Sequence, residues 1–308
     1  MHSGRCSERA VWLLRGACRV ASLKGMSTLH SRRPAVAGMF YPQDSEALRA
    51  QVAELLHAAA DTASVDGNAG RAQDGLAFSG RLKALIVPHA GYVYSGPIAA
   101  SAYRLLQPLR GQIERVVLLG PAHRVYVPTV AGAGFARFET PLGSLQVDRV
   151  WQDRADPQVV RDSPQAHGPE HSLEVQLPFL QEVLGQPRIV PLLVSDAPPA
   201  QVGAVLEQLW GGPETLVVVS SDLSHYLPYA TAKRVDADTA DRILALDLSL
   251  DGDQACGCAA VSGLLWLARR KGLSLRLLDL RSSGDTAGGR AEVVGYAAFS
   301  VYEPAPVA

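Results

Sequence analysis

Short apolar runs that alternate with longer stretches of helical periodicity narrow the possible folds of this 308-residue chain more than any other feature. Compact runs rich in Val, Ile and Leu are typical of strands buried on both faces of a sheet. We expect such strands at Leu82–Val87, Arg115–Leu119, Arg188–Val194 and Thr215–Ser220. Amphipathic stretches, expected to be helices, lie between and around them at Ser45–Ala59, Ile98–Leu106, Ser172–Leu184, Pro199–Leu209 and Ala230–Leu246. The repeated order of strand and helix predicts an α/β fold with a mostly parallel central sheet and helices on both faces.

The C-terminal part continues the pattern, with a helix expected at Gly257–Arg270 and strands at Leu273–Leu278 and Glu292–Val301. The stretch Asp61–Ser79 is small, polar and contains glycine, which predicts a mobile surface insertion. Ser282–Arg290 joins two expected strands, so a connecting turn is favoured there. The alternative for this glycine-rich turn is a nest of backbone amides that cradles a phosphate.

Basic residues gather at the start of the chain. Residues 1–33 hold seven Lys and Arg side chains against one acidic residue, Glu8. An Arg-rich, acid-poor segment of this kind can be a mitochondrial-type transit segment. We favour the alternative, a start upstream of true initiation at Met26, because the apolar patch Trp12–Leu14 lacks a clear cleavage signature. Residues 1–31 are therefore expected to be a basic extension, and residues 32–304 a single domain.

Composition excludes several classes of protein. The formal net charge of -1 argues against nucleic-acid binding, which normally requires a basic surface for phosphates. No apolar run approaches the roughly 18 residues of a membrane-spanning helix. After the basic extension only Cys256 and Cys258 remain, which suits a reducing cytoplasm. We expect a soluble cytoplasmic protein without nucleic-acid or membrane partners, and the sequence holds no nucleophile elbow, P-loop or dinucleotide fingerprint.

Histidines follow three of the expected strands at the point where each strand ends. They are His89 in IVPHAGYVYSG, His123 in VLLGPAHR and His225 in VVVSSDLSHY, and Asp222 shares the third loop. In an open α/β sheet, ligands collect in the crevice at the carboxyl ends of the strands. We therefore expect these four side chains to line one pocket. Neutral imidazole is the commonest metal ligand and suits iron, zinc and copper.

Cys256, in DQACGCAA, falls at the start of an expected helix. The helix dipole and its free amides favour a thiolate there, which would make Cys256 a candidate metal ligand. The alternative is a small buried hydrophobe in a tightly packed helix start. Cys258 is the weaker candidate, since two cysteines separated by one glycine do not have zinc-knuckle spacing.

The segment EHSLEVQLPFL places His171 and Glu174 three residues apart, on one face of an expected helix. That spacing can present a base and its partner, or two metal ligands, to one cavity. The alternative is a first helical turn with acids near the positive end of the helix dipole. The remaining histidines are expected on the surface: His2, His30, His57 and His167.

Several long motifs together resemble the Memo family, known in prokaryotes as AmmeMemoRadiSam system protein B. In chain order they are RRPAVAGMFYP, PHAGYVYSG, LGPAHR, EHSLEVQLPFL, SSDLSHY and CGC before a small-residue helix. They span roughly residues 32–302. The resemblance implies a fold like that of class III extradiol dioxygenases of the LigB type, which use non-haem iron.

The resemblance also implies roles for the candidate residues. His89 and His123 match metal ligands, and Cys256 falls where the dioxygenases supply a carboxylate as third ligand. His225, with Asp222 nearby, matches the acid/base histidine of the pocket. The family motif that contains His171 and Glu174 lines the same region.

Replacing a carboxylate ligand by a soft thiolate shifts metal preference toward copper or zinc, so ring-cleaving activity does not follow from the resemblance. The favoured hypothesis is a metal-dependent redox enzyme of unknown substrate, with Fe(II) or copper. The alternatives are a non-catalytic metallo-pocket that binds a peptide or metabolite, and a hydrolase that uses zinc. The family's system name further suggests a functional link to radical SAM and AMMECR-type proteins.

Overall fold

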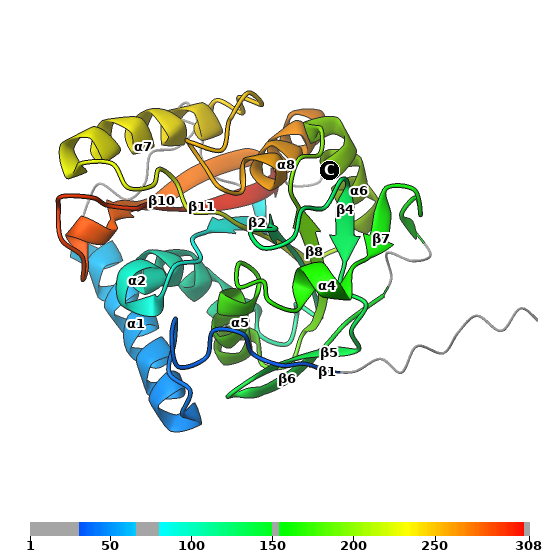
Figure 1. Cartoon of the computed structure of the whole chain (residues 1–308), viewed down its shortest axis with the longest axis horizontal. Coiled ribbons are helices and arrows are strands. Elements are labelled where there is room, and N and C mark those ends of the chain that lie inside the picture. Colours follow the sequence, from blue (N-terminus) through cyan, green and yellow to red (C-terminus); the bar gives the residue numbers. More distant parts are fainter. Residues whose placement is uncertain (1–30, 66–79, 150–153, 305–308) are drawn as a thin grey trace, which may run out of the picture.

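The computed structural model describes residues 31–65, 80–149 and 154–304 of the chain (Figure 1). Its larger sheet has eight strands, and the four in the middle run parallel to one another. In order across the sheet these four are β2 (Gly80–Val87), β9 (Thr215–Ser220), β3 (Arg115–Pro121) and β8 (Arg188–Val194). They coincide with the four strands expected from the continuous apolar runs, and the predicted α/β class is confirmed.

Further strands complete the sheet at both edges. Beside β2 lie β11 (Gly295–Pro304) and then β10 (Ser274–Ser282), each antiparallel to its neighbour. Beside β8 lie the antiparallel β4 (Val130–Gly132) and then β7 (Val160–Asp162). A separate three-stranded sheet consists of β1 (Ser31–Arg32), β5 (Arg137–Thr140) and β6 (Gly143–Gln146). The sequence did not reveal β1 or β4 to β7, because strands of two to four residues are too short to show an alternating pattern.

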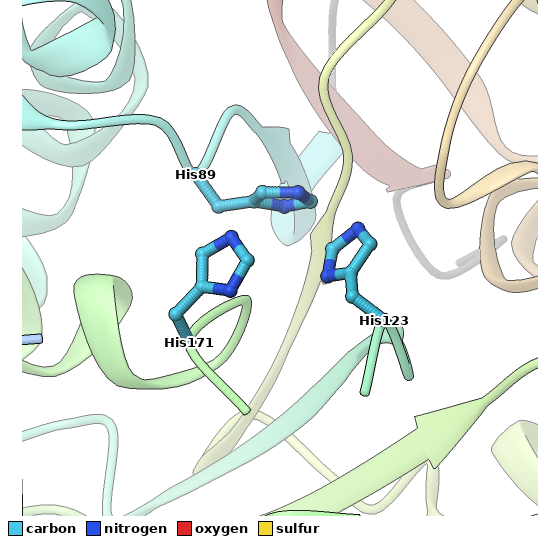
Figure 2. A group of neighbouring side chains, drawn as sticks. All are labelled: His89, His123 and His171. Atoms are coloured by element: carbon cyan, nitrogen blue, oxygen red, sulfur yellow. The ribbon is translucent and has the colours of Figure 1, made fainter. Parts of the chain in front are cut away.

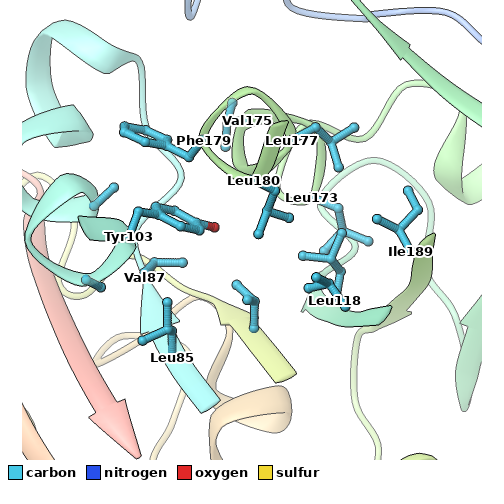
Figure 3. Packing of buried hydrophobic residues seen from close by; sticks show 14 of the residues in the cluster. Leu85, Val87, Tyr103, Leu118, Leu173, Val175, Leu177, Phe179, Leu180 and Ile189 are labelled. Carbon is cyan, nitrogen blue, oxygen red and sulfur yellow. The ribbon is translucent and has the colours of Figure 1, made fainter. Parts of the chain in front are cut away.

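Alternate residues of the central strands point to opposite faces, and each face has its own apolar core. On one face, Leu85 and Leu118 join Phe179 in a single cluster (Figure 3). The helices of this cluster are α1 (Ser45–Val65), α2 (Tyr92–Tyr103), the 3-10 helix η1 (Arg104–Leu109) and α5 (Leu177–Leu184). On the other face, Ile86 and Val117 pack with residues of α6 (Pro199–Leu209), α7 (Tyr229–Leu244) and α8 (Cys258–Lys271). Helices therefore cover both faces, as expected.

The helix expected at Ser172–Leu184 is shorter than the pattern indicates. Residues Glu174–Gln176 form a 3-10 turn (η2), and α5 begins only at Leu177. The first residues have other partners: the Ser172 hydroxyl donates to the backbone oxygen of Pro121, and the Glu174 carboxylate accepts from the backbone N–H of Ala35. These contacts hold the segment out of a regular helix.

Of the two stretches expected to be loops, the structure describes one fully and the other only in part. Ser282–Arg290 begins with a 3-10 turn, η3 (Ser283–Asp285), and joins β10 to β11, so the expected connection is confirmed. The first residues of Asp61–Ser79 belong to α1, which ends at Val65, and residues 66–79 lie outside the described part. Residues 1–30 of the expected extension also lie outside it, whereas Ser31 is part of β1. Within the described ranges, no helix is both long and apolar enough to cross a membrane.

Candidate metal centre

Three histidines meet at the carboxyl edge of the central strands (Figure 2). His89 follows β2 and His123 follows β3, and both strands border β9. His171 comes from the irregular segment between the short helix α4 (Pro164–His167) and η2. One ring nitrogen from each histidine lies within 4.8 Å of the other two. The structure thus brings together two histidines expected as metal ligands and one expected as a pocket residue.

Hydrogen bonds to Nδ1 place the ring proton on this atom in His89 and His123, and the Glu170 carboxylate beside Nδ1 favours the same tautomer in His171. The Ser220 hydroxyl donates to the backbone oxygen of Ser172, so at 2.8 Å it accepts from His89 Nδ1. Glu170 Oε1 lies 2.9 Å from Nδ1 of His123 and 3.2 Å from Nδ1 of His171. A ring that donates through Nδ1 keeps the lone pair of Nε2 free. Partners of this kind hold metal-binding histidines in the correct tautomer and orientation.

Glu170 is the functional residue that the sequence analysis missed. Its carboxylate is 2% exposed and also accepts from the backbone N–H groups of His123, His171 and Ser172. Burial raises the pKa of Glu170, but the hydrogen bonds and the charge of His123 outweigh burial and lower this pKa to about 2. The residue is therefore a buried carboxylate beside two imidazoles. An acid directly before His171 in the sequence was the available signal, because such a side chain can fold back onto the next backbone amides.

Burial also keeps two of the rings neutral. It lowers the pKa of His89 well below the usual value, and the neighbouring His123 and His171 lower it further. Burial lowers the pKa of His171 too, against the opposing charge of Glu170. Neutral imidazole is the form that binds metal.

Cys256 lies beside this group without belonging to it. Its Sγ is 3.3 Å from His89 Nε2 and 3.3 Å from the backbone nitrogen of Asp222. Burial raises the pKa of the thiol, and the charge of Asp222 raises it further. Helix α8 begins two residues later, at Cys258, so Cys256 lies just before the helix, and without a metal ion burial favours its thiol form. As a thiol, Cys256 can donate to the free lone pair of His89.

Asp222 and His225 reach the same place from the loop after β9. Asp222 is 4% exposed and accepts a 2.7 Å hydrogen bond from the backbone N–H of His89. Burial raises the pKa of Asp222 to about 7, although that N–H opposes the rise. Burial lowers the pKa of His225. Both residues line the cavity in front of the three histidines.

Two residues differ from their expected places. Glu174 is absent from the cavity lining and pairs with Arg32 at 2.7 Å, both side chains being fully buried. A partnership with His171 was one of the two alternatives for their spacing, and it does not form because the regular helix begins only at Leu177. His167, expected on the surface, is 1% exposed, and its Nε2 is 2.9 Å from the backbone oxygen of Ala131. His57 is exposed as expected, whereas His2 and His30 lie outside the described residues.

The cavity has a volume of about 720 Å³. Besides the histidines and Asp222, its wall includes Phe40, Tyr94, Tyr296 and Arg124. Cavities of this size with a mostly apolar wall and a few convergent polar groups are typical of small-molecule sites. The arrangement can hold one metal ion at its floor and a partly apolar ligand above it.

Sequence comparisons agree with the motifs in this site. A family model described as "Memo-like protein" matches residues 32–300. A MEMO1 family protein of Metallosphaera sedula is 35% identical over 282 residues, covering 87% of this chain and 98% of the relative. MEMO1 family proteins of Methanopyrus kandleri and Archaeoglobus fulgidus are 36% and 32% identical, over 98% and 97% of their lengths. The motifs that supply His89, His123, His171 and Cys256 all fall inside the matched region, and the chain belongs to the Memo family.

Proposed function

We propose that this chain is a metal-dependent redox enzyme that holds Fe(II) or copper on His89, His123 and His171. The observation that carries the proposal is the set of three imidazoles whose partners on Nδ1 make Nε2 the atom with the lone pair, which at His89 is shared only with the neighbouring Cys256 thiol. Imidazole suits iron, copper and zinc, and the thiol of Cys256 next to His89 adds a soft donor that favours Cu(I).

The three nitrogens fit one ion after a small movement. Imidazole nitrogens bind at roughly 2.0–2.1 Å from such an ion, so any two ligand atoms are at most about 4 Å apart. The present limit of 4.8 Å requires only slight closure of the rings. The buried charge of Glu170 offsets part of the cation's charge, which stabilises a positive ion at this depth.

The chain's own residues suggest how a substrate would be handled. A bound Fe(II) or copper ion would supply electron transfer and Lewis acidity. The apolar wall, with Phe40 and Tyr94, would bind an apolar part of the substrate and exclude water. Asp222, with a pKa of about 7, can hold or release a proton near neutral pH, and His225 can accept one at its ring.

The proposal extends to the setting of the reaction. From the resemblance to AmmeMemoRadiSam system protein B, we expect a cytoplasmic protein that acts together with radical SAM and AMMECR-type proteins. Its substrate would be a small molecule or a peptide.

A second candidate function is the binding of a peptide without turnover. Among the described residues, three of the large exposed apolar side chains line the cavity: Met39, Tyr94 and Tyr226. The other three, Val93, Val125 and Tyr126, lie one or two positions along the chain from the lining residues Tyr94 and Arg124. Val93, Val125 and Tyr126 do not line the cavity, so a ligand confined to it would leave them uncovered. Exposed apolar side chains beside a cavity are a feature of sites for larger partners.

Metal content and oxygen uptake together test the proposal. Full-length protein purified without oxygen is expected to contain one equivalent of iron or copper. His89→Ala, His123→Ala and His171→Ala should each lose it. The control Cys256→Ala should weaken Cu(I) binding more than Fe(II) binding, because only Cu(I) strongly prefers sulfur. Zinc at full occupancy with no oxygen-dependent reaction would favour a hydrolase, and a protein that takes up no added Fe(II), Cu(I) or Zn²⁺ would overturn the proposal.

A further inference from the structure

One buried guanidinium holds the segment that carries Glu170 and His171. Arg32 is 2% exposed, and its Nε donates to the backbone oxygen of His167 at 2.8 Å. Its Nη2 donates to the backbone oxygen of Glu170, and its Nη1 pairs with Glu174 at 2.7 Å. The segment from His167 to Glu174 contains no strand, so no ladder of hydrogen bonds fixes it. Arg32 supplies three attachment points instead.

Glu174 also forms hydrogen bonds with the N-terminal segment. Its carboxylate accepts from the backbone N–H groups of Ala35 and Val36, at 2.7 and 3.0 Å, and from the Tyr41 hydroxyl at 2.6 Å. Residues 32–41 and residues 167–174 are thereby joined at both ends. We call this set of contacts the N-terminal clasp.

The clasp reaches the metal site at two places. Phe40 lies against the ring of His171, with the ring centroids 4.9 Å apart in an edge-to-face arrangement. Glu170 is held from both sides, because its backbone oxygen binds Arg32 while its carboxylate binds His123 and His171. Movement of the Glu170 backbone would therefore shift the one group that fixes the tautomers of two rings.

The charges of the clasp are also matched. Arg32 and Glu174 are both buried and face each other, so the positive charge of the guanidinium is offset within the clasp. Because Arg32 is paired with Glu174, the negative charge of Glu170 acts on His123 and His171. The planar guanidinium presents its donors in a fixed fork, with separate N–H groups for the two backbone oxygens and the carboxylate, whereas the donors of an ammonium all radiate from one nitrogen at the end of a flexible stem.

We infer that Arg32 is a positioning residue for the metal site, acting through Glu170 and the N-terminal clasp. This inference rests on the proposed function, since it concerns the histidines assigned there to the metal. It adds that residues distant in sequence from the strand ends determine whether His123 and His171 present Nε2 to an ion.

Ring-nitrogen NMR of ¹⁵N-histidine-labelled full-length protein without added metal tests the inference independently of metal binding. The wild type should show His123 and His171 protonated at Nδ1. In Arg32→Met the two rings should show mixed tautomers, and in Arg32→Lys an intermediate mixture. The matched control is Lys83→Met: Lys83 is equally buried and donates to two backbone oxygens, those of Gly212 and Thr215. Its removal should leave both tautomers unchanged.

Titration with Co²⁺ adds a second readout on the same variants. Partners that orient metal-binding histidines typically contribute 10–100-fold to metal affinity, so Arg32→Met should bind Co²⁺ at least 10-fold more weakly. Lys83→Met should stay within twofold of the wild type. Wild-type tautomers in both Arg32 variants would overturn the inference. A wild type that binds no metal would overturn the proposed function instead, and the tautomers would still decide the role of Arg32; the Lys variant serves if Arg32→Met does not fold.

Discussion

The amino ends of the central strands (the amino edge of the sheet) and their carboxyl ends (the carboxyl edge) both bury polar side chains. Only the carboxyl edge has the features of a metal-binding site. At the amino edge, the Lys83 ammonium donates to two backbone oxygens and lies 5.2 Å from the centre of the Trp210 ring. At the carboxyl edge, His89, His123 and His171 each have a partner on Nδ1 that leaves the Nε2 lone pair available to a metal ion, and at His89 the Cys256 thiol lies 3.3 Å from this atom. The cavity opens onto this second group.

The comparison shows that burial of a polar group does not by itself indicate function. Buried polar groups normally have hydrogen-bond partners, and Lys83 follows this rule. What distinguishes the carboxyl edge is unused capacity to bind: several lone pairs converge on a point that a ligand can reach. Substitutions at the two edges should therefore change different measurements.

Among substitutions that keep all three histidines, the largest effect on metal binding is expected from Glu170→Gln. The amide removes a buried charge and can donate to Nδ1 of a histidine, which would move the ring proton to Nε2 and block the ligand atom. Since Glu170 orients two rings, we expect Fe(II) or Co²⁺ affinity to fall about 100-fold, measured by competition with a chelator. Glu303→Gln, at the amino edge, is the control and should bind metal as the wild type does. Equal affinity in the Glu170 variant would contradict the assigned role.

A smaller loss is expected from Ser220→Ala, which removes the Nδ1 partner of His89 alone. One freed ring should lower metal affinity by about 10-fold. Ser300→Ala is a close control, because Ser300 is also fully buried in the sheet and its hydroxyl has no hydrogen-bond partner. If both variants bound metal equally, the His89 tautomer would not depend on Ser220.

No change in metal binding is expected from Lys83→Met, but the pH dependence of stability should change. Burial lowers the pKa of Lys83 from 10.5 to about 8. Between these values the unfolded chain holds a proton that the folded chain has released, so the wild-type free energy of unfolding should rise with pH. The rise is at most about 3 kcal/mol, and Lys83→Met should remove it. Urea unfolding at pH 8 and pH 10 measures the change in the free energy of unfolding of each protein. The same change in the wild type and in Lys83→Met would contradict the lowered pKa of Lys83.

Strand ends made part of the site predictable. His89, His123, Asp222 and His225 follow continuous apolar runs, and parallel strands buried on both faces leave little choice about where such residues lie. The strand order β2–β9–β3 then places these residues together at the carboxyl edge of the sheet. This part of the site required only the pattern of the chain and the rule that ligands bind at that edge.

The rest of the site depends on contacts that no local pattern records. The spacing of His171 and Glu174 predicted one helical face, but Arg32, far away in sequence, draws Glu174 into the clasp. Glu170 was overlooked because its role requires the approach of His123 from the end of β3. His167 looked like a surface residue in a polar stretch, and only the fold places it beneath β4. Long-range hydrogen bonds decided these positions.

X-ray absorption spectroscopy of the Fe(II)-loaded chain tests the central claim most directly. The account predicts three imidazole nitrogens at roughly 2.0–2.1 Å from the metal, typical of such ligands. It further predicts that His171→Ala, which should lose the ion on purification, shows one imidazole fewer when excess Fe(II) is added, and that Glu174→Ala keeps all three. An iron spectrum with two imidazoles and a sulfur, unchanged by His171→Ala, would contradict the three-histidine centre and assign the third position to Cys256.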